Sequence, residues 1–277
     1  MRPWKAAVCQ MDSQMDRKEN LAAAEGMIRR AAEEGASLAA FPENVTYMGR
    51  GYRKQAEPAD GESMCFFRQM AKDNQIWVMT GSFPEADPSG KPKNTLLLID
   101  PDGQVRAKYS KIHLFDMSLE GQVPQLESSY VTGGDGLSVC ETDLGCLGFS
   151  ICYDIRFGEL YRLLALNGAQ VIFVPASFTR KTGEMHWKTL LRARAIENGA
   201  YIIAPDQCGR KTNMHAHGHS MIIDPWGQVI AEAGGDDPEI VYAEIDPEEC
   251  AKARAQIGSL KNRRPDVYQL AGSVRKY

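Results

Sequence analysis

Three residues whose types could together cleave an acyl bond each follow an apolar run in this chain. Cys152 closes the apolar stretch 144–152 and precedes a polar turn, and a second apolar run, 171–175, follows about one helix later. The thiol is therefore predicted to lie where a buried strand meets a helix, exposed at the sheet edge and near helix-terminal N–H groups. Glu43 follows a second predicted strand, and Lys111 follows a predicted hairpin. Polar residues at strand ends gather at one edge of an α/β sheet, so we expect the three side chains to meet.

These residue types match what a cysteine nucleophile needs. It requires a way to become a thiolate, a charge that stabilises the oxyanion, and an acid that releases the leaving group. The ends of three predicted strands could supply all three needs. A packing cysteine, by contrast, has no need of a strand–helix junction.

Three ordered segments around these residues resemble the catalytic motifs of the nitrilase superfamily of carbon–nitrogen hydrolases. They are Pro42-Glu43, Tyr109-Ser110-Lys111-Ile112-His113 and Cys152-Tyr153-Asp154-Ile155-Arg156-Phe157. The resemblance runs from about residue 4 into the tail. It implies a four-layer αββα sandwich, usually paired into dimers or larger assemblies, and a Glu–Lys–Cys triad. Leu126-Glu127-Ser128 is similar to the family segment that carries a second glutamate.

The resemblance assigns a role to each residue. Glu43 would accept the Cys152 proton and later donate it to the leaving group. Lys111 would stay cationic, stabilise the oxyanion together with the Tyr153 backbone N–H, and lower the thiol pKa. Glu127 would orient Lys111 and the substrate amide. The acyl-thioester on Cys152 would then be hydrolysed by a water that Glu43 activates, with no metal or organic cofactor.

The second half of the chain narrows the expected substrate. Segments 175–179, 182–183, 186–187 and 191–198 resemble the amidase branch that acts on small ω-amide acids. Segments 206–210, 218–227 and 263–268 resemble the subgroup that cleaves deaminated glutathione, a 2-oxo acid carrying a Cys-Gly group. This reaction would be a metabolite repair in the cytoplasm. The side chains predicted to bind this small-molecule substrate are Tyr153, Arg156, Ser177, Phe178, Thr179, Thr182 and His186.

Several alternatives remain beside this interpretation. Within the superfamily they are an ω-amidase for 2-oxoglutaramate-like substrates or another amide, carbamoyl or nitrile hydrolase. A catalytically silent binding protein of the same fold is the contrasting class, and the intact Glu–Lys–Cys set argues against it. A Cys–His hydrolase using His113 or His186 ranks low because Glu43 is the better base. Asp154 and Arg156 are expected to form buried ion pairs at the elbow, although Arg156 could meet an anionic substrate.

A histidine cluster offers a further alternative. His215, His217 and His219 alternate, so on a strand they would share one face, as metal ligands can. Gly218-His219-Ser220 begins a predicted strand, but the preceding residues have the polar composition of a loop. We therefore predict no metal site.

The order of apolar patterns predicts one α/β domain over residues 1–277 with internal pseudo-symmetry. Predicted helices span 16–34, 63–73, 157–167, 184–198 and 247–256. Predicted strands span 5–11, 37–41, 76–82, 94–100, 104–108, 137–140, 146–151, 170–174, 201–205, 219–223, 228–231 and 240–245. Two hairpins of the same kind turn at 101–103 and 224–227. The long segment 115–136 lacks periodicity and is a candidate functional loop. The basic tail 258–277 is expected to dock at a subunit interface.

Bulk properties exclude several classes of protein. The 277 residues carry a net charge of −4, which gives no indication of a nucleic-acid or acidic-membrane partner. Hydrophobic residues make up 43%, yet no apolar run is long enough for a membrane span. The first residues lack a signal-peptide pattern. The 7 cysteines include no CxxC pair, so reduced thiols in the cytoplasm are expected.

Overall fold

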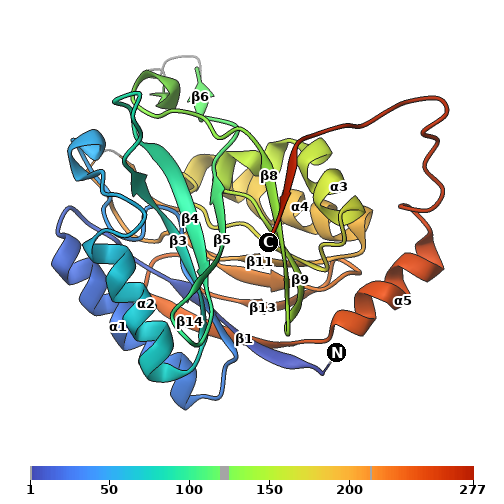
Figure 1. Ribbon diagram of the computed structural model, residues 1–277, viewed down its shortest axis with the longest axis horizontal. Helices are drawn as coiled ribbons and strands as arrows, with labels where there is room; N and C mark the ends of the chain where they lie inside the picture. Colours follow the sequence, from blue (N-terminus) through green and yellow to red (C-terminus); the bar gives the residue numbers. More distant parts are fainter. Residues whose placement is uncertain (1, 119–124, 213) are drawn as a thin grey trace.

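The chain forms two sheets that pack face to face between two layers of helices. The computed structural model describes residues 2–118, 125–212 and 214–277. Figure 1 shows α1 (Arg17–Glu33) and α2 (Glu62–Asn74) on one side of the stacked sheets. It shows α3 (Gly158–Leu166) and α4 (Arg180–Asn198) on the other. This arrangement confirms the predicted αββα layers.

The first sheet has six strands in the order β14-β1-β2-β3-β4-β5. Their bounds are Glu239–Ile245 for β14, Trp4–Gln10 for β1, Leu38–Ala40 for β2, Trp77–Glu85 for β3, Lys93–Ile99 for β4 and Val105–Ser110 for β5. The second sheet has seven strands in the order β13-β12-β11-β10-β9-β8-β15. Their bounds are Val229–Glu232 for β13, Met221–Ile223 for β12, Tyr201–Ala204 for β11, Val171–Phe173 for β10, Gly145–Phe149 for β9, Leu137–Thr142 for β8 and Val274–Lys276 for β15.

The two halves of the chain repeat one topology. In the first half β1, β2 and β3 are parallel, and β4 and β5 return antiparallel. In the second half β9, β10 and β11 are parallel, and β12 and β13 return antiparallel. Both return hairpins turn alike, because the Asp100 and Asp224 carboxylates each accept hydrogen bonds from the backbone N–H groups two and four residues further on. The predicted pseudo-symmetry is thus visible in the strand order.

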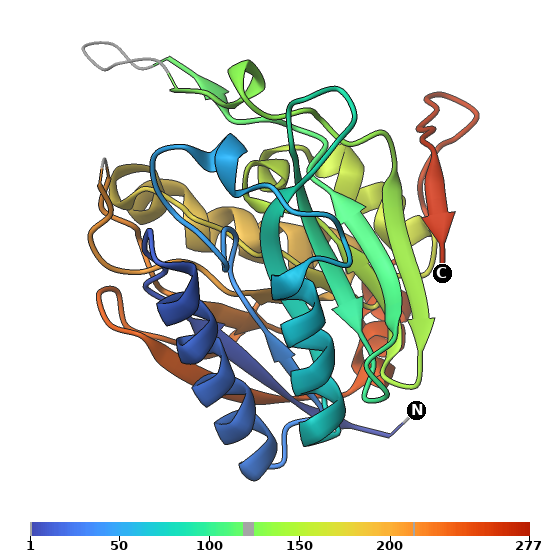
Figure 2. The same ribbon diagram turned by 60° about the vertical axis from the view of Figure 1, so that its left-hand side comes forward.

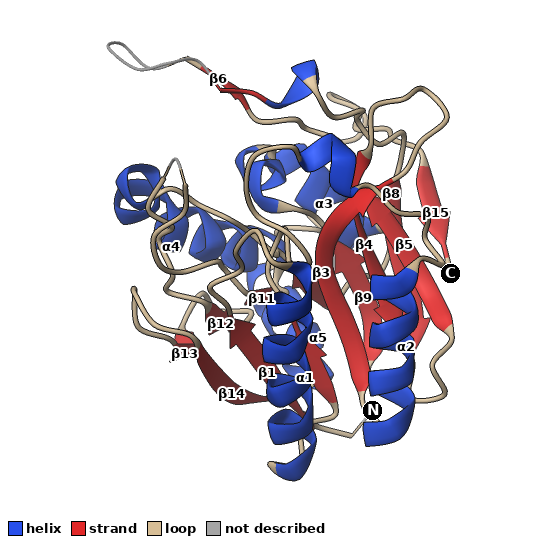
Figure 3. Cartoon of the chain, turned by 90° about the vertical axis from the view of Figure 1, so that its left-hand side faces the viewer, coloured by secondary structure: helices blue, strands red, loops and turns tan. Residues whose placement is uncertain are grey.

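Alternating side chains explain why the first sheet can be covered on both faces. Ala6 and Val8 of β1 belong to the core between the two sheets, whereas Ala7 and Cys9 belong to the core beneath α1 and α2. The opposite faces of a strand carry alternate residues, so one apolar run supplies both layers. Figure 3 shows α1 and α2 lying side by side over this sheet.

Several elements differ from the sequence-based expectations. Helix α4 begins at Arg180 rather than at 184, because the Thr179 side chain caps its first turn by accepting a hydrogen bond from the Thr182 N–H. The long segment contains a two-stranded sheet of β6 (Asp116–Met117) and β7 (Gln125–Leu126) and a 3-10 turn, η2 (Glu127–Ser129). Residues 119–124 of that segment lie outside the described residues.

The tail ends as a strand of the chain's own second sheet. After α5 (Pro247–Ile257) the chain runs to β15, which pairs in parallel with β8, as Figure 2 shows at the C-terminus. A strand of three residues is too short for its hydrophobic periodicity to be recognised in the sequence. No helix in the described ranges is both long and apolar enough to cross a membrane.

Candidate active site

Cys152 lies at a strained elbow between β9 and the 3-10 turn η3 (Cys152–Arg156). Its φ of 50° is in the left-handed region, which non-glycine residues rarely occupy. The Cys152 N–H donates to the Pro175 carbonyl at 2.9 Å, which ties the elbow to the end of β10. Strain of this kind persists only where the surroundings over-determine the backbone, and it gathers at functional sites. The elbow predicted from the apolar run 144–152 is therefore present.

Asp154 holds this elbow through hydrogen bonds rather than through Arg156. The fully buried carboxylate accepts from the Ile151 N–H at 2.9 Å and the Tyr109 hydroxyl at 2.6 Å. It also accepts from the His113 N–H at 3.0 Å and lies 2.7 Å from His113 Nδ1. The sequence predicted buried ion pairs for Asp154 and Arg156. The His113 ring is the one possible ionic partner of Asp154 in the described part of the chain, and Arg156 has no carboxylate within ion-pair distance there.

Lys111 lies between two carboxylates in the interior. Its Nζ is 2.9 Å from Glu43 Oε1 and 2.9 Å from Glu127 Oε2. All three side chains are buried, with residue exposures of 2% for Lys111, 3% for Glu43 and 8% for Glu127. Glu127 Oε2 also accepts the Phe115 N–H at 2.6 Å, which fixes the start of the long loop to the site. The structure thus brings together the glutamates and the lysine that the sequence singled out.

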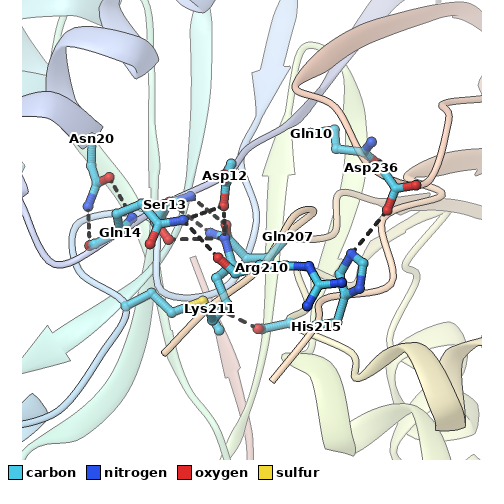
Figure 4. A network of polar contacts seen from close by, with 12 residues as sticks. Gln10, Asp12, Ser13, Gln14, Asn20, Gln207, Arg210, Lys211, His215 and Asp236 are labelled. Atoms are coloured by element: carbon cyan, nitrogen blue, oxygen red, sulfur yellow. Dashed lines mark hydrogen bonds and ion pairs between the residues drawn. The ribbon is translucent and has the colours of Figure 1, made fainter. Parts of the chain in front are cut away.

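Two amide side chains that the sequence gave no reason to select hold the glutamates in place, Asn94 at the carboxylates and Gln207 at the Glu43 backbone. Asn94 Nδ2 donates to Glu43 Oε1 at 2.8 Å and to Glu127 Oε1 at 3.4 Å. Gln207 is fully buried and donates through Nε2 to the Glu43 carbonyl at 2.9 Å and to Ser13 Oγ at 2.9 Å. Figure 4 shows Gln207 joined to Ser13 and Lys211 in one polar network. Only the fold brings these distant segments together, so no local motif could reveal them.

The electrostatics of the site favour a protonated thiol and a charged lysine. Burial raises the pKa of the Cys152 thiol well above its ordinary value; the Glu43 carboxylate adds to this rise and Lys111 opposes it. Lys111 thus lowers the thiol pKa as expected, but burial and Glu43 outweigh this contribution. Burial would lower the pKa of Lys111, but Glu127 and Glu43 outweigh it and raise that pKa. A neutral thiol needs a base during attack, which Glu43 can provide.

These groups open into one large cavity of about 880 Å³. Cys152, Glu43, Lys111 and Glu127 all line it. Six of the predicted substrate-binding residues also line it: Tyr153, Arg156, Ser177, Phe178, Thr179 and Thr182. His186 does not line the cavity. Its Nδ1 lies 3.3 Å from Nη1 of Arg156, so it contacts a residue that does.

Part of the cavity wall comes from a segment that the sequence did not identify. Tyr52, in the 3-10 turn η1 (Tyr52–Gln55), and its neighbours Arg50, Arg53 and Lys54 line the cavity. The Tyr52 hydroxyl is buried without a hydrogen-bond partner in the described part of the chain. Burial, and then Glu127 and Glu43, raise the pKa of this hydroxyl, so it remains a hydrogen-bond donor. Its sequence context, between two loops, carries no periodic signal.

The three alternating histidines have different partners. His215 Nε2 lies 3.0 Å from Asp236 Oδ1, whereas the rings of His217 and His219 lie 4.7 Å apart and are tilted by 40°. Burial and the neighbouring His219 lower the pKa of His217 to about 4. Within the described ranges no three metal-ligating side chains come together.

Comparison with known proteins agrees with this geometry. Residues 5–255 match the model of the carbon–nitrogen hydrolase family. The chain belongs to this family. Its resemblance to the nitrilase superfamily is thereby confirmed, and it is an amide-hydrolysing enzyme.

Relatives of this carbon–nitrogen hydrolase share nearly its full length. A deaminated glutathione amidase of Synechocystis is 44% identical over 270 residues, covering 95% of this chain and 99% of that protein. The human omega-amidase NIT2 is 36% identical over 271 residues, covering 97% of this chain and 98% of the relative. The structure of yeast Nit3, a nitrilase-superfamily member, has a TM-score of 0.85 at 33% identity, covering 95% of this chain and 97% of that one.

Proposed function

We propose that this enzyme hydrolyses the side-chain amide of a small 2-oxo acid, deaminated glutathione in the first place, through an acyl-thioester on Cys152. The observation that carries the proposal is the placement of Cys152 in one cavity with Lys111, which two buried carboxylates flank. The name of the Synechocystis relative supports the choice of substrate.

In the first half-reaction the Cys152 sulfur attacks the amide carbon while its proton passes to Glu43. The carbonyl oxygen becomes an oxyanion, which Lys111 and the Tyr153 N–H stabilise. The Cys152 N–H is already engaged by Pro175, which leaves the next N–H of the turn for this purpose. Glu43 then protonates the leaving nitrogen, and the C–N bond breaks. For deaminated glutathione the leaving group is cysteinylglycine.

In the second half-reaction water takes the place of the departed amine. Glu43 removes a proton from this water, whose oxygen attacks the thioester carbon, and Lys111 again stabilises the oxyanion. The C–S bond breaks, the thiol regains its proton and 2-oxoglutarate is released. Glu127 takes no proton in this scheme. It positions Lys111, with which it shares a 2.9 Å contact.

The placement of Arg156 supports a substrate that carries a carboxylate on its acyl part. Its guanidinium lies over the rings of Tyr153 and Phe178, at 5.6 and 5.7 Å from their centres. Its Nε is buried without a hydrogen-bond partner in the part of the chain that the structure describes. A guanidinium held between two aromatic faces at the cavity wall presents a ready fork for a carboxylate. The carboxylate of a 2-oxo acid meets this requirement.

The second candidate is an ω-amidase for 2-oxoglutaramate. The likeness to the human omega-amidase favours it, and the same residues would act, with ammonia as the leaving group. The two substrates share the acyl group and differ only beyond the scissile bond. An assay panel of deaminated glutathione, 2-oxoglutaramate and simple nitriles separates the candidates by kcat/KM. Release of cysteinylglycine supports the first candidate. Turnover of 2-oxoglutaramate alone would overturn it.

The cellular setting is part of the same proposal. A cytoplasmic, metabolite-repair role would suit a small-molecule amidase with reduced cysteines, and all 7 cysteines are free thiols. We place the chain as a single domain in a homodimer or larger homo-oligomer, with the exposed part of the tail 258–277 at the subunit interface. Sedimentation of the full chain against a chain ending at residue 257 tests this assignment.

A further inference from the structure

The charges that line the cavity are unevenly distributed. Among the described residues its only lining carboxylates are Glu43 and Glu127, and both contact Lys111. The other charged side chains in the described part of the wall are cationic: Arg50, Arg53, Lys54, Arg156, Arg180 and Lys181. A concave surface lined by one sign of charge concentrates ligands of the opposite sign. The proposed chemistry uses just one of these cations, Arg156.

The segment 50–54 contributes both buried and exposed groups to the cavity wall. Tyr52 lies on the inner side of this segment. Its hydroxyl is buried, and its pKa is raised by burial and then by the charges of Glu127 and Glu43. Arg50 and Lys54 are exposed on either side of Tyr52 and also line the cavity. The two cations therefore lie on the outer part of the wall whose inner part reaches the site.

The ion pairing of these cations differs. Arg180, which also lines the cavity, lies 3.4 Å from Glu184 and 3.5 Å from Asp236. Arg53 donates to the Gly90 carbonyl at 2.7 Å. Arg50 and Lys54 have no carboxylate within ion-pair distance in residues 2–118, 125–212 and 214–277. Within these residues, therefore, no anion neutralises the charges of Arg50 and Lys54.

The cavity volume leaves room for a ligand group at this position. If each heavy atom takes the room of one liquid water, the about ten heavy atoms of 2-oxoglutaramate fill roughly 300 Å³. The about twenty heavy atoms of deaminated glutathione fill roughly 600 Å³ on the same basis. The cavity of about 880 Å³ accommodates the larger substrate, whose glycine carboxylate lies at the end remote from the acyl group.

We propose that Arg50 and Lys54 form a second anion subsite, which binds a carboxylate on the leaving group of the substrate. This inference rests on the proposed function and deepens it. Arg156 binds the acyl carboxylate, the triad holds the amide, and the outer cations bind the far carboxylate. The subsite makes the enzyme select a dianionic amide with a carboxylate on each side of the scissile bond over a simple ω-amide.

A substrate–residue cycle tests the subsite. The variants are Arg50→Met, Lys54→Met and the double variant, which remove charge and keep much of the side-chain length. The substrates are deaminated glutathione, its analogue with the glycine carboxylate converted to an amide, and 2-oxoglutaramate. We expect kcat/KM for deaminated glutathione to fall about fivefold in each single variant and roughly twentyfold in the double variant, chiefly through KM. Lys252→Met, on the distant helix α5, is the matched control.

The other two substrates decide the interpretation. For the wild type, kcat/KM should be lower on the amidated analogue than on deaminated glutathione by a factor similar to that of the double substitution. The double variant and the wild type should have equal kcat/KM on the amidated analogue, and equal kcat/KM on 2-oxoglutaramate. An equal loss on all three substrates, or none on any, overturns the subsite while leaving the proposed function intact. Wild-type enzyme that does not hydrolyse deaminated glutathione overturns the proposed function instead. Calorimetric binding of deaminated glutathione to Cys152→Ala, with and without Lys54→Met, then judges the subsite separately: equal affinities overturn it.

Discussion

Lys111 Nζ and Glu127 Oε2 lie 2.9 Å apart in the interior, although one follows β5 and the other begins η2. Glu43 makes a second contact of the same length with Lys111. One positive charge therefore faces two carboxylates and cannot neutralise both. This arrangement leaves the local charge negative when the thiol is neutral. It accounts for a lysine that stays cationic in a buried site. Burial first, and then the Glu43 charge, raise the pKa of the Cys152 thiol and keep it protonated.

Replacing Glu127 by glutamine should remove the charge that positions Lys111. The amide oxygen can still accept the Phe115 N–H, so the fold should survive. We expect kcat to fall about a hundredfold, in line with the loss of groups that orient a reacting residue. Steady-state kinetics measures this, with Glu33→Gln on the exposed face of α1 as control. A variant with unchanged kcat would show that the Glu127 charge has no part in positioning Lys111 for the reaction.

Glu43→Gln should stop proton transfer without disturbing the hydrogen bonds around it. The glutamine oxygen can accept from Asn94 and Lys111 as the carboxylate does. Loss of a general base costs about 10²–10⁴ in rate, so kcat should fall within that range while the melting temperature changes little. Turnover above a tenth of the wild-type value would contradict the assignment of Glu43 as the base.

Alkylation of the free enzyme should report the raised pKa of Cys152. The thiolate is the reactive form, and a raised pKa means that its fraction grows only as the pH rises into the alkaline range. The iodoacetamide rate at Cys152 should therefore climb steadily from pH 6 to pH 9 without an inflection near neutrality. Peptide mapping separates Cys152 from the exposed Cys65, which serves as internal reference. A plateau below pH 7 would indicate a preformed thiolate and refute the proposed protonation state.

Asp154→Ala should destabilise the elbow strongly. It removes the buried acceptor of the Ile151 N–H, the Tyr109 hydroxyl and the His113 N–H. Each buried donor left unsatisfied costs about 1–3 kcal/mol, so the free energy of unfolding should drop by about 3–5 kcal/mol. Asp135→Ala, which breaks an exposed ion pair with Arg275, should cost less than about 1 kcal/mol. Similar losses in urea unfolding of the two variants would refute this role of Asp154.

Local patterns predicted the layers, most helices and the three triad positions. Strand ends and hairpin turns have short-range signals, so Glu43, Lys111 and Cys152 could be placed from their flanks. Asn94 and Gln207 could not, because their roles arise from contacts across 51 and 164 residues. Tyr52 was missed for the same reason.

Turn geometry decided two points on which the sequence is silent. Asp154 and Arg156 are two residues apart, yet the turn directs Asp154 to Tyr109 and His113, and Arg156 to the cavity. The alternating histidines would share a face only on a strand, and the residues before Gly218 have the composition of a loop. His215 pairs with Asp236 and β12 begins only at Met221, so the strand does not extend to the histidines.

Trapping the acyl-enzyme tests the central claim most directly. The wild type, quenched in acid within one turnover of deaminated glutathione, is digested and its peptides are mapped by mass spectrometry. The account predicts a hydroxylamine-sensitive 2-oxoglutaryl adduct on the peptide that contains Cys152, with no adduct and no turnover in Cys152→Ala. Full turnover in Cys152→Ala, or an adduct on another residue, would contradict it.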